Sequence, residues 1–155
     1  MLILGIDPGI SNTGYGLLNY SSGKIEIISF GLITPPIKKN NNEKLFFIFT
    51  KIQDLLNKFS PNQFAIEEAF FGKNIKSTMV LSHVRAVISL AVTQKQIPFF
   101  EYSPKKIKMS VVGNGNASKE QVKYMVLSLL NMKDKGYKYD IYDAIAIGIC
   151  HIHQI

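Results

Sequence analysis

The chain opens with an apolar run that does not alternate with polar residues. Residues 2–6 are aliphatic or glycine, which is typical of a strand buried on both faces of a sheet. Asp7 follows directly, and Pro8-Gly9 then turns the chain. A carboxylate at the end of a buried strand is costly unless something compensates its charge. Asp7 is therefore either a capping residue of the turn or part of a charged site.

Four more segments have the pattern of strands. Residues 13–20 and 24–33 flank the turn Ser21-Ser22-Gly23, which predicts a hairpin. Residues 63–67 and 98–102 are shorter candidates, and the first of these ends in Glu67, much as the opening strand ends in Asp7.

Two helices are expected between these strands. Residues 43–59 place apolar side chains on one helical stripe, which we interpret as core packing. Residues 76–95 predict a longer helix whose apolar residues cover well over half of its circumference. Packing on a sheet alone requires less, so we expect this helix also to contact another element or a second subunit.

The last third of the chain predicts further helices. Ser103-Pro104 is a plausible helix start, and residues 111–116 read as a turn-rich break. Ser118 with Gln121 forms a capping box that begins the next helix.

A basic loop at residues 133–138 leads to the last helix, which is expected from near Asp140 to about His153. The order of elements, a hairpin followed by alternating strands and helices, predicts an α/β fold with a five-stranded mixed sheet and helices on both faces. We find no repeat or linker and expect one domain over residues 1–155.

Composition narrows the class of function. The 155 residues carry a formal charge of +7, which points to a polyanionic partner. Of the 18 basic residues only Arg85 is an arginine, and lysines suit phosphate binding better than the reading of base edges. A lysine-rich composition can also reflect the base content of a genome, and the sequence leaves both explanations open.

The cysteine count and the hydropathy pattern indicate the cellular compartment. Cys150 is the single cysteine, so no internal disulfide is possible. No stretch of 18 consecutive apolar residues exists, and the N-terminus lacks the pattern of a signal peptide. We therefore expect a cytoplasmic protein with no membrane span.

Four acidic residues form the candidate site. Asp7 and Glu67 would lie at one sheet edge if their strands are parallel neighbours, and Asp140 and Asp143 share one helix face. Like charges about 4 Å apart repel by roughly 4 kcal/mol at an effective dielectric of about 20. Hard divalent cations such as Mg²⁺ relieve this repulsion, and two such ions can stabilise the attacking and leaving oxygens in phosphodiester cleavage.

Simpler interpretations exist for several of these residues. Asp140 and Asp143 have the position of ordinary acids in a first helical turn. Glu68 is interpreted as solvated or as a support for Glu67. The three histidines, His83, His151 and His153, show no ligand spacing and are interpreted as structural or surface residues.

Four motifs in order resemble the RuvC family of Holliday-junction resolvases: GIDPGISNTGYGLL, AIEEAFFGKN, YSPKKIKMSVVGNGNASKEQV and DIYDAIAIGICHIH. The resemblance covers nearly the whole chain. It implies a ribonuclease-H-like fold, a homodimer with the long helix in its interface, and a catalytic metal site at Asp7, Glu67, Asp140 and Asp143. From the chemistry of the carboxylates we expect Mg²⁺ as cofactor, two ions per site, with Mn²⁺ as a substitute. The resemblance adds RuvA and RuvB as partners.

The resemblance adds candidate DNA-binding residues. Phe70, with Phe71 beside it, matches an aromatic position that stacks on junction bases, although core packing is the alternative. Lys73 follows in the same segment, and Lys108 and Lys119 match basic positions near the scissile phosphate. Lys119 opposes the helix dipole in a first turn, which favours a functional reason for it.

The resulting hypothesis is an endonuclease that resolves four-way DNA junctions in recombination and repair and leaves 5′-phosphate and 3′-hydroxyl ends. A ribonuclease H would use a similar acidic site but needs no dimer. An actin-like ATPase shares the first loop but needs two domains, for which the chain is short. A junction-binding protein without cleavage would not need four converging carboxylates.

Overall fold

The computed structural model describes residues 1–69 and 72–155. Within them the strands form one sheet in the order β3-β2-β1-β4-β5. The strands are β1 Leu2–Asp7, β2 Thr13–Ser21, β3 Lys24–Ile33, β4 Gln63–Glu67 and β5 Phe99–Tyr102. β1, β2 and β3 are antiparallel neighbours, whereas β4 is parallel to β1 and β5 to β4. The predicted hairpin and mixed sheet are confirmed.

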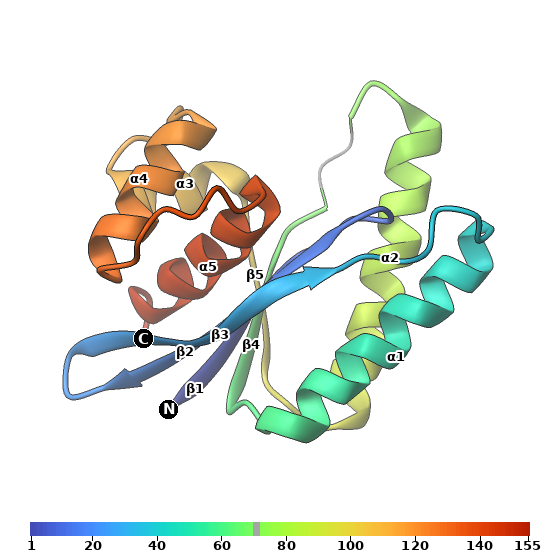
Figure 1. The fold of residues 1–155 in the computed structure, drawn as a ribbon, viewed down its shortest axis with the longest axis horizontal. Coiled ribbons are helices and arrows are strands. Elements are labelled where there is room, and N and C mark those ends of the chain that lie inside the picture. The colour runs from blue at the N-terminus through green and yellow to red at the C-terminus, as the bar shows by residue number, and fades with distance from the viewer. Residues whose placement is uncertain (70–71) are drawn as a thin grey trace.

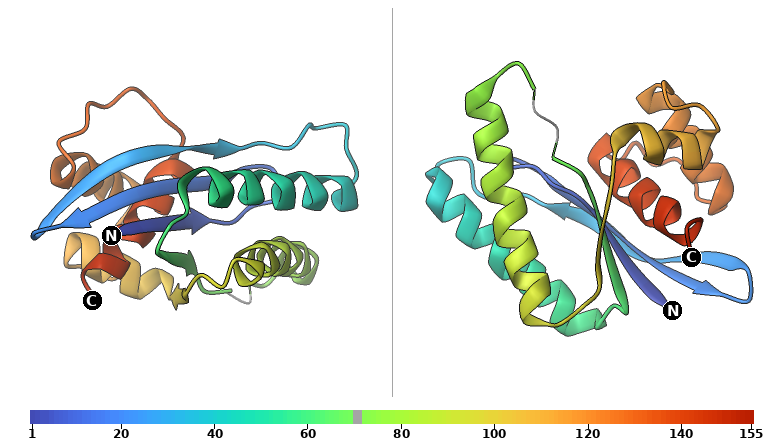
Figure 2. Two further views of the ribbon diagram at one scale, coloured as in Figure 1. Left: turned by 90° about the horizontal axis from the view of Figure 1, so that it is seen from below. Right: turned by 180° about the vertical axis from the view of Figure 1, so that it is seen from behind.

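Helices cover both faces of this sheet, as predicted (Figure 1). They are α1 Asn41–Phe59, α2 Ile75–Gln94, α3 Pro104–Val112, α4 Lys119–Leu129 and α5 Tyr139–Ile152. α1 and α2 lie together on one face, and α5 lies on the other with α3 and α4 outside it, as the views in Figure 2 also show.

Alternation along β1 decides which face each side chain meets. Ile3 packs in the core with α5, whereas Leu4 and Ile6 pack in the core with α1 and α2. Because successive side chains of a strand point to opposite faces, Asp7 shares the α5 face with Ile3. In β4, Ala65 packs with α5, so by the same rule Glu67 also belongs to that face.

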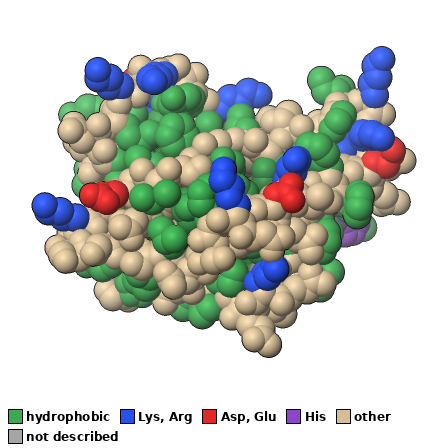
Figure 3. Space-filling view, turned by 60° about the horizontal axis from the view of Figure 1, so that its bottom comes forward, with side chains coloured by type: hydrophobic (Ala, Val, Ile, Leu, Met, Phe, Trp, Pro, Cys, Tyr) green, Lys and Arg blue, Asp and Glu red, His purple; other side chains and the backbone are tan. Residues whose placement is uncertain are grey.

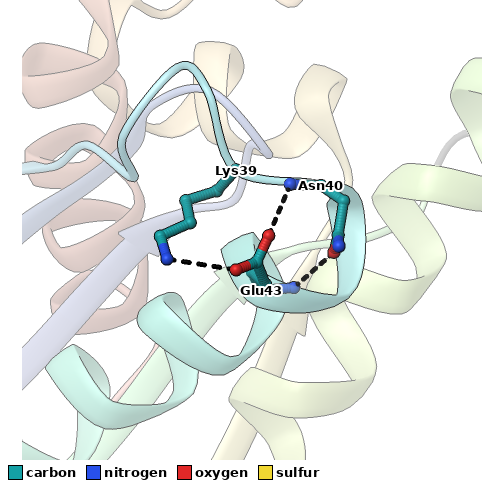
Figure 4. A network of polar contacts seen from close by, with 3 residues as sticks. All are labelled: Lys39, Asn40 and Glu43. Carbon is teal, nitrogen blue, oxygen red and sulfur yellow. Dashed lines mark hydrogen bonds and ion pairs between the residues drawn. The ribbon is translucent and has the colours of Figure 1, made fainter.

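Helix ends differ from the sequence-based expectation by one or two residues. α2 and α5 each begin and end one residue earlier than expected, and two further differences have an identifiable cause. α1 begins at Asn41 rather than at residue 43, because Asn40 and Glu43 form a capping box that extends the first turn. Lys39 Nζ also contacts Glu43 Oε1 at 3.0 Å (Figure 4). The predicted break at residues 111–116 begins too early, since α3 continues through Val112 and ends at Gly113 in a left-handed conformation.

α2 keeps apolar side chains on its outside although it packs against α1. Val84, Ile88 and Ala91 are buried, whereas Met79 and Leu90 are more than half exposed. Within the described residues, α2 is the one helix whose length and composition would suit a membrane span. Core helices of soluble proteins share these properties, so this is weak evidence, and the expectation that no segment spans a membrane stays a prediction.

Candidate active site

Asp7 and Glu67 end neighbouring parallel strands. Ile6 of β1 pairs with Ile66 of β4, so the next residue on each strand is one of the two acids. Both lie on the face covered by α5, which follows from the alternation of side chains described above. The conditional expectation that these two strands are parallel neighbours is confirmed.

Glycines in the sheet bring the first turn of α5 beside Asp7. A Cβ atom at Gly14, which pairs with Asp7, would lie 2.0 Å from the backbone oxygen of Asp140. A Cβ atom at Gly5 would lie 2.3 Å from the oxygen of Ala144. Only strands without side chains at these positions allow the backbone of α5 to approach so closely, and this approach carries Asp140 and Asp143 to the carboxyl end of β1.

A cleft of about 230 Å³ lies where these elements meet. Its polar walls come from five of the residues singled out in the sequence, and its apolar walls come from α3, α4 and α5. The lining residues are Asp7, Glu67, Lys108, Lys119, Asp143, Pro104, Ile107, Val122 and Ile147. Asp140 does not line the cleft, but it is close enough for its charge to act on Asp7 and Asp143.

The carboxylates of the cleft resist ionisation. Burial, followed by the charges of Asp143, Glu67 and Asp140, raises the pKa of Asp7 well above its ordinary value. Burial raises the pKa of Glu67 and Asp143 as well. Positive charge at Lys119 works in the opposite direction on all three carboxyls. A site that makes its own carboxylates costly to ionise gains free energy from any bound cation.

Contacts between α4 and α5 place Lys119 at this cleft. Tyr139 Oη donates a hydrogen bond to Glu120 Oε1 at 3.1 Å, which joins the first turns of the two helices. The exposed Lys119 Nζ then lies 3.9 Å from Asp143 Oδ2. Lys108 approaches from α3 and is half-buried. Both lysines therefore bring positive charge to the edge of an acidic cleft.

The donor chemistry of the cleft fits a hard divalent cation, because its polar walls offer carboxylate oxygens. In residues 1–69 and 72–155, however, no three acidic, histidine or cysteine side chains are arranged to hold a metal ion as they stand. Asp7, Glu67 and Asp143 nevertheless line the same cleft.

The remaining candidates are placed less centrally. Lys73 is exposed before α2, and Phe70 and Phe71 lie outside the described residues. His151 is buried and structural, as interpreted from the sequence, because its Nε2 donates to Gln63 Oε1 at 2.8 Å and its Nδ1 accepts from Tyr102 Oη at 2.7 Å.

Basic side chains do not gather in one dense patch on the face shown in Figure 3 but are scattered among apolar, neutral and a few acidic side chains. Sequence reasoning missed Arg85, whose side chain contacts the backbone of Glu67. The one feature of the sequence that could have drawn attention to this residue is that it is the single arginine of the chain.

Comparison with known proteins assigns this arrangement to a family. The family model described as "Crossover junction endodeoxyribonuclease RuvC" matches residues 3–151. The chain belongs to the RuvC family. A relative from Ruminiclostridium cellulolyticum with that name is 40% identical over 151 residues, which covers 97% of this chain and 91% of the relative. One from Alkaliphilus oremlandii is 38% identical and covers 99% and 93%.

A solved structure supports the same assignment of fold. RuvC of Thermus thermophilus in complex with a Holliday junction substrate is 26% identical, with a TM-score of 0.90 over 98% of this chain and 93% of that one. The ribonuclease-H-like resolvase fold inferred from the sequence is therefore confirmed.

Proposed function

We propose that this RuvC-family chain is a metal-dependent endonuclease that resolves four-way DNA junctions, acting in recombination and repair in the cytoplasm as a single nuclease domain. Membership of the family supports cleavage of junctions as the activity. The observation that carries the location of the chemistry is the cleft in which Asp7, Glu67 and Asp143 stand beside Lys108 and Lys119.

Asp7, Glu67, Asp140 and Asp143 would hold Mg²⁺, two ions per site, with Mn²⁺ able to substitute. When bound, such ions stabilise charge on the attacking and leaving oxygens of a phosphodiester. Burial of Asp7 and the charges around it make a cation the favourable partner of this cleft. Rotation of the acidic side chains toward the bound ions would replace their mutual repulsion by coordination.

Lys108 and Lys119 would bind non-bridging oxygens of the scissile phosphate. Lys119 Nζ now lies 3.9 Å from Asp143 Oδ2, a separation at which its charge stays available to an incoming phosphate. In-line hydrolysis by water would leave 5′-phosphate and 3′-hydroxyl ends. Lys73, Phe70 and Phe71 remain proposed DNA contacts, the two aromatics as surfaces for base stacking.

We propose a homodimer whose interface includes the outer side of α2. Ile75, Met79 and Leu90 are exposed apolar side chains on this helix, and a second copy would cover them. Leu90→Glu should convert the dimer into monomers in analytical ultracentrifugation, whereas Leu129→Glu, an exposed apolar position on α4, should leave the mass unchanged. RuvA and RuvB remain proposed partners, testable by co-purification with junction DNA.

The deciding experiment compares a synthetic four-way junction, a linear duplex and an RNA–DNA hybrid, each with Mg²⁺ and with EDTA. Symmetrical nicks confined to the junction and to Mg²⁺ are expected. Efficient cleavage of the hybrid would instead support a ribonuclease H, and binding of the junction without cleavage in Mg²⁺ or Mn²⁺ would contradict the proposal.

A further inference from the structure

Arg85 is a buried cation on α2. It is the only arginine among 18 basic residues, and it is 9% exposed. No other lysine, arginine, aspartate or glutamate within residues 1–69 and 72–155 is buried to this degree. A buried charge persists only where partners compensate it, and a guanidinium differs from an ammonium in offering a rigid fork of donors. The partners of this one arginine therefore indicate its role.

The fork of Arg85 reaches two strands at once. Nη1 donates to the backbone oxygen of Glu67, the last residue of β4, and Nη2 pairs with the carboxylate of Glu101 on β5. These strands are neighbours, since Glu67 pairs with Tyr102. Arg85 thus joins α2 to the carboxyl ends of two parallel strands. One of these ends is Glu67, whose carboxylate lines the cleft.

The two faces of the sheet separate Arg85 from the reaction. The side chain of Glu67 belongs to the α5 face and lines the cleft, whereas α2 lies on the opposite face. Arg85 therefore holds the main chain of Glu67 from behind without entering the cleft. Its positive charge also favours the ionised form of Glu67, whose pKa it lowers against the effect of burial.

We propose that Arg85 is a positioning residue, which fixes the backbone of Glu67 through its carbonyl oxygen and is itself oriented by Glu101. The inference rests on the proposed function, because the position of Glu67 matters only if its carboxylate binds the catalytic cation. Residues that orient metal ligands from behind typically change metal affinity or activity by about 10- to 100-fold when they are removed.

The test compares wild type with Arg85→Met, Arg85→Lys and Glu101→Gln. Calorimetric titration with Mn²⁺ measures the affinity of the cleft for a cation, single-turnover cleavage of a four-way junction measures the reaction, and junction binding in EDTA measures DNA affinity alone. Val84→Ala is the matched control, because Val84 is a fully buried neighbour on the same helix and packs on the α1 side.

Arg85→Met should weaken Mn²⁺ binding and slow single-turnover cleavage by about 10- to 100-fold, while the junction dissociation constant in EDTA stays within about twofold. Arg85→Lys should recover part of both losses, because an ammonium can satisfy one partner but lacks the fork. Glu101→Gln keeps an acceptor oxygen for Arg85 and should show the smallest loss. Val84→Ala should lower the melting temperature with Mn²⁺ binding unchanged.

Unchanged Mn²⁺ affinity in folded Arg85→Met would overturn the proposal, as would an equal loss in Val84→Ala. If Arg85→Met does not fold, Arg85→Lys and Glu101→Gln decide: weaker Mn²⁺ binding supports the role, and wild-type binding overturns it. Failure of the proposed nuclease function can be distinguished from failure of the Arg85 proposal, because in the first case wild type itself would leave the junction uncut.

Discussion

The two faces of the sheet are packed by different means. On the α1 and α2 face, large aliphatic and aromatic side chains such as Ile52, Leu56 and Phe64 fill the space between sheet and helices. On the α5 face, Gly5 and Gly14 leave no side chain between the strand and the helix backbone. On the α1 and α2 face, apolar side chains hold the helices away from the sheet. On the α5 face, the backbone of the helix contacts the strands directly, and its first turn lies beside the end of β1.

This difference places the acidic site on the α5 face. Burial of large apolar side chains contributes about 1.5–3 kcal/mol each, and both faces hold such a core, with Ile52 and Leu56 on one and Ile145 and Ile149 on the other. Only the α5 face also carries Asp7, whose charge is opposed by burial and by neighbouring acids. The comparison predicts that apolar core substitutions on the α1 and α2 face change stability and leave the chemistry intact, whereas substitutions of the acids and close glycine contacts on the α5 face impair the chemistry.

The largest effect is expected for Asp7→Asn. Loss of a proposed ligand should reduce junction cleavage by about 10³-fold or more, with junction binding in EDTA retained. Because the amide cannot ionise, the variant should also melt at a higher temperature than wild type in EDTA. Loss of both binding and stability would instead show that Asp7 is a structural residue.

Gly14→Ala should be the next most harmful to cleavage. The added methyl group would meet the backbone of Asp140 and push the first turn of α5 away from Asp7, and a displacement of about 1 Å can cost about 10²-fold in rate. Gly31→Ala is the control, since the atoms nearest to its methyl group would belong to the Tyr15 side chain rather than to backbone. Equal cleavage by the two variants would show that close approach at Gly14 is dispensable.

Leu56→Ala tests the opposite face. Removal of this buried side chain should cost about 2–5 kcal/mol, and each kcal/mol lowers the melting temperature by about 2–4 °C in a chain of this size. At a temperature where the variant remains folded, its single-turnover cleavage rate should match that of wild type. A rate that falls with stability would contradict the separation of the two faces.

The stability of the metal-free protein should depend on pH through Asp7. A carboxyl whose pKa is raised on folding stabilises the fold fully below its unfolded value, and this contribution is lost as pH rises through the folded value. Wild type should therefore lose stability relative to Asp7→Asn as pH rises above 3.8, the ordinary value for this group. Melting curves of both proteins in EDTA over a pH series measure this difference in stability. A difference that does not change with pH would refute the prediction.

The smallest effect is expected for Lys119→Gln. A lysine that binds one phosphate of duplex DNA contributes about 0.9 to the slope of log affinity against log salt concentration. Junction binding by the variant should show a slope that is less steep by about this amount. The exposed Lys24→Gln on β3 serves as the control, and an identical slope for wild type and Lys119→Gln would exclude a phosphate contact at Lys119.

Local patterns in the sequence determined the elements and their faces. The unbroken apolar run before Asp7 predicted a central strand, and the stripe that includes Ile48 and Ile52 predicted a core-facing helix, because burial selects apolar residues with the period of each element. The capping box at Ser118 placed the start of α4 at Lys119. The start of α1 was missed because the capping signal at Asn40 lies before its apolar stripe.

Only the tertiary structure decided how the charged residues meet. Parallel pairing of β1 and β4 depends on contacts between segments about 60 residues apart, which no local pattern encodes. The approach of Asp140 to Asp7 depends on Gly14, whose role appears only once a helix lies against it. Arg85 was likewise one basic residue among many in the sequence, and its two partners became visible because folding brings α2 behind the ends of two strands.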